Sequence, residues 1–139
     1  MSALFTIGYE QAKSSAVIGE LQRGGVGLVV DTRAIAASRR PGFSKRQLAA
    51  GLDEAGIGYL HLQKLGTPKE GRDAARGGNL KKLFDIYEKH LATPDADAQL
   101  DELTAIVKSG RPVCLLCYER DVAHCHRKRI AQLILGSDL

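Results

Sequence analysis

Apolar and polar positions along the chain follow two alternating patterns. Short apolar runs of strand length lie at residues 3–8, 27–30, 57–62 and 113–117. Between these runs the apolar positions recur every three or four residues, which is the spacing of one buried face of a helix. The pattern therefore predicts short strands that are separated by helices.

The residue types at the ends of the helical segments support this interpretation. A serine at position 14 or 15 is suited to cap the first helix, and Gly24-Gly25 ends it. Ser44 and Gln47 have the spacing of a capping box at the start of the second helix. Proline at the first helical position favours a helix that starts at Thr93-Pro94. The predicted helices cover about 14–24, 44–56, 80–91, 93–110 and 125–135.

The element order β-α-β-α-β-α-α-β-α predicts an α/β fold. Apolar strands that are joined through helices need right-handed crossovers, which align the strands in parallel. We therefore expect a single domain over residues 1–139. It should be a three-layer sandwich, with a mostly parallel sheet of about four strands and helices on both faces. Crossover rules favour the strand order 3-2-1-4.

Distinctive polar residues follow the predicted strands. In parallel sheets, ligands bind at the carboxyl ends of the strands, and all of these ends open on one edge. The residues expected to converge there are Tyr9 and Glu10, Asp31 and Arg33, His61, and Cys117 and Glu119. Because these residues are far apart in the sequence, their convergence at one edge is the strongest functional argument that the chain offers.

Composition limits the class of protein. The chain has 139 residues, of which 44% are hydrophobic and 26% are charged, as in an ordinary globular domain. No apolar run approaches the roughly 20 residues that span a bilayer. The first residues lack the features of a secretory signal. Three cysteines show no disulfide framework. We therefore expect a cytoplasmic, reduced protein with no membrane partner.

The net charge of +4 is mild but unevenly distributed. The basic residues are clustered along the chain. Clusters of basic residues suit binding of phosphate or nucleic acid, although a solvated helix face is their commoner cause. Four tyrosines, three phenylalanines and no tryptophan give little support to stacking on single-stranded bases. The basic residues form two groups, Arg33, Arg39, Arg40, Lys45 and Arg46, and then Arg127, Lys128 and Arg129.

Residues 117–127 hold two of the three cysteines and two of the four histidines. Cys117 ends a predicted strand, and Cys125 begins a predicted helix. Helix-terminal amides and nearby cations lower the pKa of a thiol, and the thiolate is the nucleophile. Cys117 or Cys125 is thus the candidate nucleophile or redox thiol, and Glu119 or His126 is the candidate to handle the proton. Cys114, within an apolar strand, is expected in the core.

An anion site is predicted beside these thiols. Arg33, Arg39 and Arg127 would contribute positive charge, together with the amide groups that open the last helix. Phosphatase and sulfur-transfer domains place a cysteine and an arginine six positions apart in an anion-cradling loop. Six residues after Cys117 is Ala123, which counts against that mechanism. Asp31 is expected to orient substrate or to form an ion pair with Arg33 or Arg39.

Six segments together resemble the domain of unknown function 488 family. They are 5–9, 30–33, 38–45, 59–61, 65–66 and 117–127, and the closing Cys-His-Arg motif is specific. The resemblance implies a compact cytosolic α/β domain with a cysteine-containing site, and it brings no settled reaction. The positions that it marks are Tyr9, Asp31, Arg33, Ser38, Arg39, Tyr59, Cys117, Glu119, Cys125, His126 and Arg127.

Three functional hypotheses follow. The leading one is a small enzyme acting on a phosphate-containing substrate, such as a nucleotide or a nucleic-acid component, with no cofactor. Its alternative is a non-catalytic module that binds a nucleotide or nucleic acid. The third is a zinc or redox thiol protein. Zinc is disfavoured and no metal site is assigned, because the candidate ligands come mainly from one segment rather than from two. The oligomeric state stays open.

Overall fold

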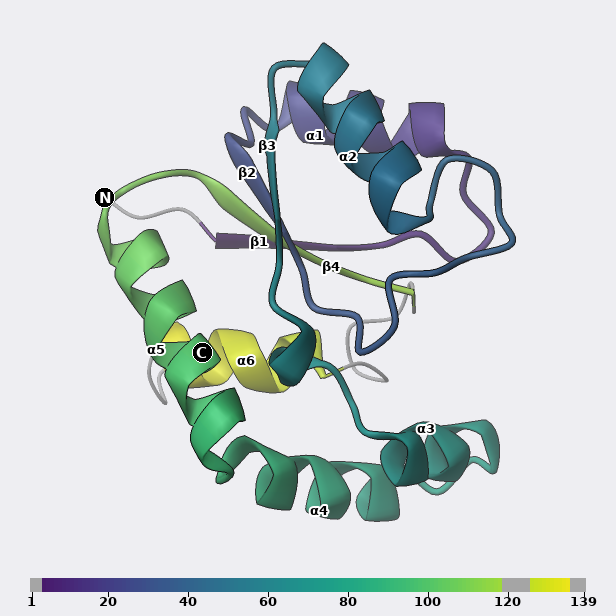
Figure 1. Ribbon diagram of the computed structural model, residues 1–139, viewed down its shortest axis with the longest axis vertical. Helices are drawn as coiled ribbons and strands as arrows, with labels where there is room; N and C mark the ends of the chain where they lie inside the picture. Colours follow the sequence, from purple (N-terminus) through teal and green to yellow (C-terminus); the bar gives the residue numbers. More distant parts are fainter. Residues whose placement is uncertain (1–3, 119–125, 136–139) are drawn as a thin grey trace.

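The computed structural model describes residues 4–118 and 126–135, and these form an α/β domain. The strands are β1 (Leu4–Gly8), β2 (Leu28–Asp31), β3 (Gly58–His61) and β4 (Val113–Cys117). All three pairings between them are parallel (Figure 1). The predicted fold class is therefore confirmed.

The sheet order is β1-β4-β2-β3, so the predicted order 3-2-1-4 is wrong. Strand β4 lies between β1 and β2, and its Val113 is in register with both Leu4 and Leu28. Burial explains the difference. All five residues of β4 are buried, whereas Phe5 and Thr6 of β1 are exposed. A strand that is apolar on both faces is stabilised in the middle of a sheet, and β1 tolerates the edge.

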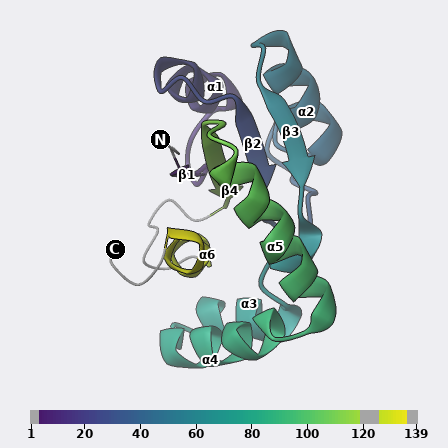
Figure 2. The ribbon, with the colours of Figure 1, turned by 90° about the vertical axis from the view of Figure 1, so that its left-hand side faces the viewer.

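The helices form two layers around the sheet (Figures 1 and 2). Helices α1 (Ser14–Arg23) and α2 (Lys45–Glu54) cover one face. The other side carries the short helix η1 (Gln63–Leu65), α3 (Lys69–Arg76), α4 (Leu80–Leu91), α5 (Pro94–Lys108) and α6 (Arg127–Leu135). The three-layer arrangement agrees with the prediction. None of the described helices has the length and apolar character needed to cross a bilayer.

The core is divided by the sheet because successive strand residues point to opposite faces. Val29 and Leu116 pack with the apolar faces of α1 and α2. Val30 and Leu115 pack with α4, α5 and α6, where Tyr87 is completely buried. Each strand therefore contributes to both halves of the core, and this fixes the register of its polar carboxyl end.

Helix α3 has no counterpart in the sequence prediction. Its eight residues are mostly charged or small, and only Gly71 and Ala74 are buried. A periodic apolar face is what identifies a helix in a sequence, and this segment has none. The capping box also differs from the prediction. Ser44 precedes α2 but makes no side-chain cap, and Gln47 Oε1 accepts a hydrogen bond from the Gly42 amide.

The connections after the strands diverge beside the carboxyl end of β4. The chain leaves β1 and β2 toward the face of α1 and α2, whereas it leaves β3 and β4 toward the opposite face. Since β4 lies between β1 and β2, neighbouring connections diverge on both of its sides. Parallel sheets commonly bind ligands at such points, so this edge is where we look for a candidate site.

Candidate functional site

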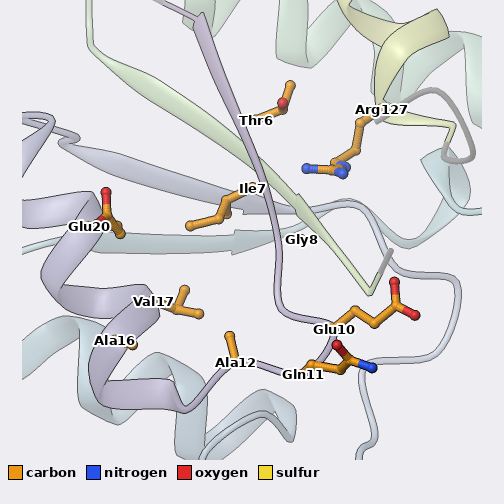
Figure 3. A pocket seen from close by; sticks show the side chains of 10 residues that line it. All are labelled: Thr6, Ile7, Gly8, Glu10, Gln11, Ala12, Ala16, Val17, Glu20 and Arg127. Carbon is orange, nitrogen blue, oxygen red and sulfur yellow. The ribbon is translucent and has the colours of Figure 1, made fainter. Parts of the chain in front are cut away.

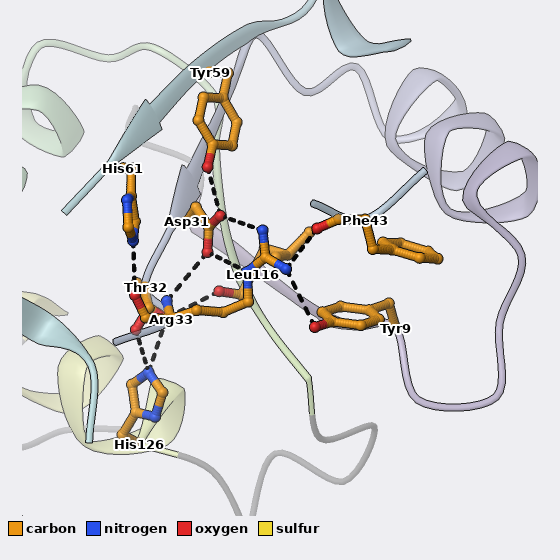
Figure 4. A network of polar contacts seen from close by, with 9 residues as sticks. All are labelled: Tyr9, Asp31, Thr32, Arg33, Phe43, Tyr59, His61, Leu116 and His126. Atoms are coloured by element: carbon orange, nitrogen blue, oxygen red, sulfur yellow. Dashed lines mark hydrogen bonds and ion pairs between the residues drawn. The ribbon is translucent and has the colours of Figure 1, made fainter. Parts of the chain in front are cut away.

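Asp31 and Arg33 form a buried ion pair at the carboxyl end of β2 (Figure 4). Arg33 Nε donates to Asp31 Oδ1 at 2.8 Å, and Nη2 donates to Oδ2 at 2.6 Å. The backbone amide of Arg33 also donates to Oδ1, at 3.1 Å. Burial opposes the charge on Arg33, but the Asp31 bonds outweigh it and raise the pKa of Arg33. The ion pair expected for Asp31 is thus present.

The remaining donors of Arg33 connect β2 to the segment that follows it. Nη1 donates to the Tyr9 hydroxyl at 3.2 Å and to the Phe43 carbonyl at 2.6 Å. The Tyr9 and Phe43 rings stack with centroids 4.3 Å apart. Four of the five N–H groups of this guanidinium are therefore bonded within the protein. Arg33 thus has one N–H group without an acceptor among the described residues, and its side chain mainly holds these segments together.

Strand β3 supports the same network from the other side. The Tyr59 hydroxyl donates to Asp31 Oδ2 at 2.5 Å, and burial together with this bond raises the pKa of Tyr59. His61 Nε2 bonds the Arg33 carbonyl at 2.7 Å. A carbonyl only accepts, so Nε2 carries the proton. Tyr59 and His61 thus hold the end of β2 in position.

His126 is buried among three segments. Its Nε2 lies 2.8 Å from the Thr32 carbonyl and must donate to it, and Nδ1 lies 3.1 Å from Thr67 Oγ1, whose hydroxyl donates. Burial is the main cause that lowers the pKa of His126 to about 4. The imidazole is therefore neutral at pH 7. Because Nδ1 already accepts a hydrogen bond, this geometry favours a structural contact over proton abstraction.

The cysteines have different surroundings. Cys114 is a free, buried thiol, and burial raises its pKa to about 12, which agrees with the core position expected for it. Cys117 is 1% exposed and disulfide-bonded. A sulfur in a disulfide is neither a nucleophile nor a zinc ligand until it is reduced. The other two candidates in this segment, Glu119 and Cys125, lie outside the described residues.

A small pocket opens at the carboxyl edge of the sheet. Its volume is about 130 Å³. We call it the edge pocket, and its described lining consists of Tyr9, Arg33, Ala34, Ile35, Thr67, Arg72, Cys117, Tyr118 and His126. Four of the predicted site residues, Tyr9, Arg33, Cys117 and His126, are thus brought together from segments 117 positions apart.

Arg72 is the principal cation of the edge pocket that the sequence did not indicate. It stands on α3, and its Nη1 donates to the Thr67 carbonyl at 2.9 Å. None of the ion pairs among the described residues includes Arg72. The remaining donors of its guanidinium are not occupied by a carboxylate there. Arg72 was missed because the helix that carries it has no apolar period.

The loops around the edge pocket meet at Gly66. A Cβ atom on this residue would lie 2.1 Å from the Ala34 backbone nitrogen, so only glycine allows the two loops to touch. This contact places Thr67 opposite the end of β2, within reach of His126. The Leu65-Gly66 pair was one of the segments in the family resemblance, and it was the indication in the sequence that this loop mattered.

The described lining of the edge pocket carries positive charge. No acidic side chain is among its described lining residues. The charge of Arg33 is balanced by Asp31 behind it, whereas that of Arg72 is not balanced by a described carboxylate. Thr67 lies two residues before the start of α3, and His126 directly precedes α6. Helix N-termini carry a partial positive charge that favours anions.

Other predicted anion ligands lie apart from the edge pocket. Arg39 is exposed on the loop after β2, and Ser38 Oγ accepts from the Arg40 amide at 3.1 Å. Arg40 donates through its side chain to the carbonyls of Tyr9 and Ala12, which fixes this loop. The basic group around Arg39 is therefore partly structural.

Arg127 lines a different pocket, beside β1 and α1 (Figure 3). Its volume is about 690 Å³, and Glu10 and Glu20 also line it. The Arg127 side chain is 1% exposed. The predicted arginine cluster is thus divided between two sites, because α6 directs Arg127 toward β1 while Arg33 stays on the β2 side.

Comparisons with known proteins identify a family and no relative of known activity. A family model described as "Domain of unknown function DUF488" matches residues 13–134, most of the chain, and confirms the resemblance inferred from the sequence motifs. No curated protein and no solved structure matches the chain.

Proposed function

The chain belongs to the family described as Domain of unknown function DUF488, and on that premise we propose a function from the site. We propose that it is a small enzyme that acts on a phosphate-containing substrate. The phosphate would occupy the edge pocket, and the reacting groups would come from the segment after β4. Neither the reaction nor the substrate follows from the family name.

One observation carries this proposal: two arginines and no described carboxylate line a small pocket at the carboxyl edge of the sheet. A charge-assisted hydrogen bond from arginine to phosphate is among the stronger polar contacts in proteins. Arg72 would supply most of these bonds, and Arg33 would add its one remaining N–H group. The starts of α3 and α6 add a favourable field.

The Asp31–Arg33 network would give the pocket a rigid wall. It joins Tyr9 after β1 and Tyr59 on β3 to the end of β2. Because these groups are mutually bonded, and Tyr9, Asp31 and Arg33 are also buried, they should change little when a ligand enters. Tyr9, Asp31 and Tyr59 would thus act by positioning Arg33 and the loop after it.

The chemical step would fall to the segment 117–127. His126 has a hydrogen-bond partner on each ring nitrogen, so Glu119 is the better candidate for moving a proton. Cys117 or Cys125 is the candidate nucleophile, and either would take that part only after the disulfide of Cys117 is reduced.

Binding of a simple anion tests the proposal. Inorganic phosphate and ribose 5-phosphate are titrated into wild-type protein and into Arg72→Ala by calorimetry. The variant should bind at least about tenfold more weakly, since a hydrogen bond to a charged group contributes about 1.5–3 kcal/mol. Arg76→Ala is the matched control, because Arg76 lies on the same helix, is exposed and pairs with Asp73.

Two results would overturn the proposal. One is equal binding to wild type and Arg72→Ala, and the other is no binding of either probe. The catalytic part is tested separately by screening phosphate esters for turnover with Glu119→Gln and Cys125→Ser. Loss of turnover with unchanged phosphate binding is expected. If no ester is turned over by wild type but phosphate binds, the non-catalytic binding module replaces the enzyme.

A second function, thiol redox chemistry, is favoured by the disulfide of Cys117. Cys117 lines the edge pocket, so its oxidation state would bear directly on the ligand site. A redox thiol protein should show a reduction potential near that of the cytosolic thiol pool. A potential far below that range would make the disulfide structural and remove this alternative.

A further inference from the structure

Two large apolar side chains are exposed at the edge pocket. Ile35 is 59% exposed and Tyr118 is 45% exposed, and both line this pocket. They come from different segments, the loop after β2 and the end of β4. Exposed apolar residues that stand singly need no explanation, but two from separate segments at one pocket form a surface for a ligand.

The Tyr118 ring is held in position. It lies edge-on to the buried Tyr9 ring, with centroids 5.3 Å apart and an angle of 84° between the planes. Tyr9 is itself fixed by its stacking on Phe43 and by its bond to Arg33. An aromatic side chain that is ordered before binding loses little entropy when a second ring packs on it.

The size of the edge pocket limits what it encloses. At about 130 Å³ it is well below the roughly 300–1,000 Å³ of pockets that enclose whole small molecules. Only one group of a ligand fits inside. The rest of a ligand anchored there must extend over the rim, where it meets Tyr118 and Ile35.

We infer that the ligand is a mononucleotide. This inference rests on the proposed function and adds the substrate class. The phosphate occupies the edge pocket beside Arg72, the ribose spans the mouth, and the base packs against Tyr118 and Ile35. A base has an apolar, planar face that stacks on an aromatic ring, and such stacking tolerates different bases.

A nucleic-acid strand fits these observations less well. Proteins that hold single strands present successive aromatic residues along a basic groove. At this rim Tyr118 is the one exposed aromatic residue among the described residues, and Arg39, the exposed member of the neighbouring basic loop, does not line the edge pocket. A single base and a terminal phosphate match the site more closely.

Four probes separate the parts of the ligand: inorganic phosphate, ribose 5-phosphate, adenosine and adenosine monophosphate. Calorimetry should show that the nucleotide binds at least about tenfold more tightly than ribose 5-phosphate, the gain that stacking of one base provides. Arg72→Ala should weaken binding of the three phosphate-bearing probes.

Rim variants assign the base site. Tyr118→Ala and Ile35→Ala should each reduce nucleotide affinity toward that of ribose 5-phosphate, and they should leave the binding of ribose 5-phosphate unchanged. Tyr118→Phe keeps the ring and should keep the affinity. Leu133→Ala is the control, since Leu133 is 39% exposed on α6 and does not line the edge pocket.

The outcomes distinguish this inference from the proposed function. If ribose 5-phosphate binds through Arg72 and the nucleotide binds no better, the base site is wrong and the phosphate site stands. If no phosphate-bearing probe binds, the proposed function fails and the inference fails with it. If an oligonucleotide binds far more tightly than the mononucleotide, with a steep salt dependence, the ligand is a strand and the inference is overturned.

Discussion

Asp31 holds the guanidinium of Arg33 with both carboxylate oxygens, at 2.8 and 2.6 Å, in a site where the two residues are 0% and 6% exposed. The partners are two positions apart, yet the pair joins β1, β2 and β3 through Tyr9 and Tyr59. A local pair thus organises a site built from distant strands.

Removal of one charge from this pair should lower the free energy of unfolding substantially. Asp31→Asn leaves Arg33 buried without a counter-ion, and breaking a buried pair in this way costs about 3–5 kcal/mol. Urea denaturation measures the free energy of unfolding. The exposed pair of Glu20 and Arg23 is the matched control, and Glu20→Gln should cost less than about 1 kcal/mol. If the two variants lost similar amounts of unfolding free energy, the Asp31–Arg33 pair would not be buried as described.

The stability of the fold should fall on acidification because of His126. Its pKa is lowered from 6.5 to about 4 in the folded protein, mainly by burial, with the charge of Arg127 acting in the same direction. The unfolded chain therefore binds the proton first. The contribution of neutral His126 to the free energy of unfolding is therefore complete above pH 6.5. It falls by about 3 kcal/mol as the pH is lowered from 6.5 to 4.

A series of urea denaturations between pH 7.5 and pH 4 would measure this slope. The same series on His126→Gln should be flatter in that window, because glutamine does not titrate. Other groups protonate in both proteins, so the difference between the two curves is the quantity to compare. Parallel curves would show that His126 does not titrate with a lowered pKa.

Gly66 should be intolerant of any side chain. Gly66→Ala places a Cβ atom 2.1 Å from the Ala34 nitrogen, where backbone rather than a flexible side chain must move. We expect a loss of about 3 kcal/mol in the free energy of unfolding and weaker phosphate binding, since the displaced loop carries Thr67. Thermal denaturation and calorimetry measure the two effects.

Gly77→Ala provides the control for this substitution. Its new Cβ atom would be 3.6 Å from the Asp73 carbonyl oxygen, an ordinary contact, so stability should stay within about 1 kcal/mol of wild type. If Gly66→Ala were equally neutral, the close approach of the two loops would be absent in solution.

The thiols should react in a defined order. Cys114 should resist alkylation in the folded protein, because it is buried and its pKa is raised to about 12. Cys117 should be labelled only after reduction, since it is disulfide-bonded. Mass spectrometry of unreduced, denatured protein should find Cys114 labelled and Cys117 unlabelled; labelling of Cys117 without a reductant would contradict the disulfide.

Much of the fold could be predicted from periodicity. The four strands and five of the helices have apolar patterns long enough to identify them. Their order along the chain was predicted correctly, although the order of the strands within the sheet was not. Helix α3 was missed because its buried residues, Gly71 and Ala74, are too small to produce a hydrophobic period. That omission also concealed Arg72, the main cation of the edge pocket.

The sequence by itself determined the α/β class, the convergence of Tyr9, Arg33 and Cys117 on one edge, and the pairing of Asp31 with a nearby arginine. These follow from short-range pattern and from the direction of parallel strands. The strand order, the separation of Arg127 from Arg33, and the arrival of Arg72 and Thr67 at the pocket were decided by the tertiary structure. They depend on which strand must be buried on both faces and on how closely two loops approach, and no local pattern encodes either.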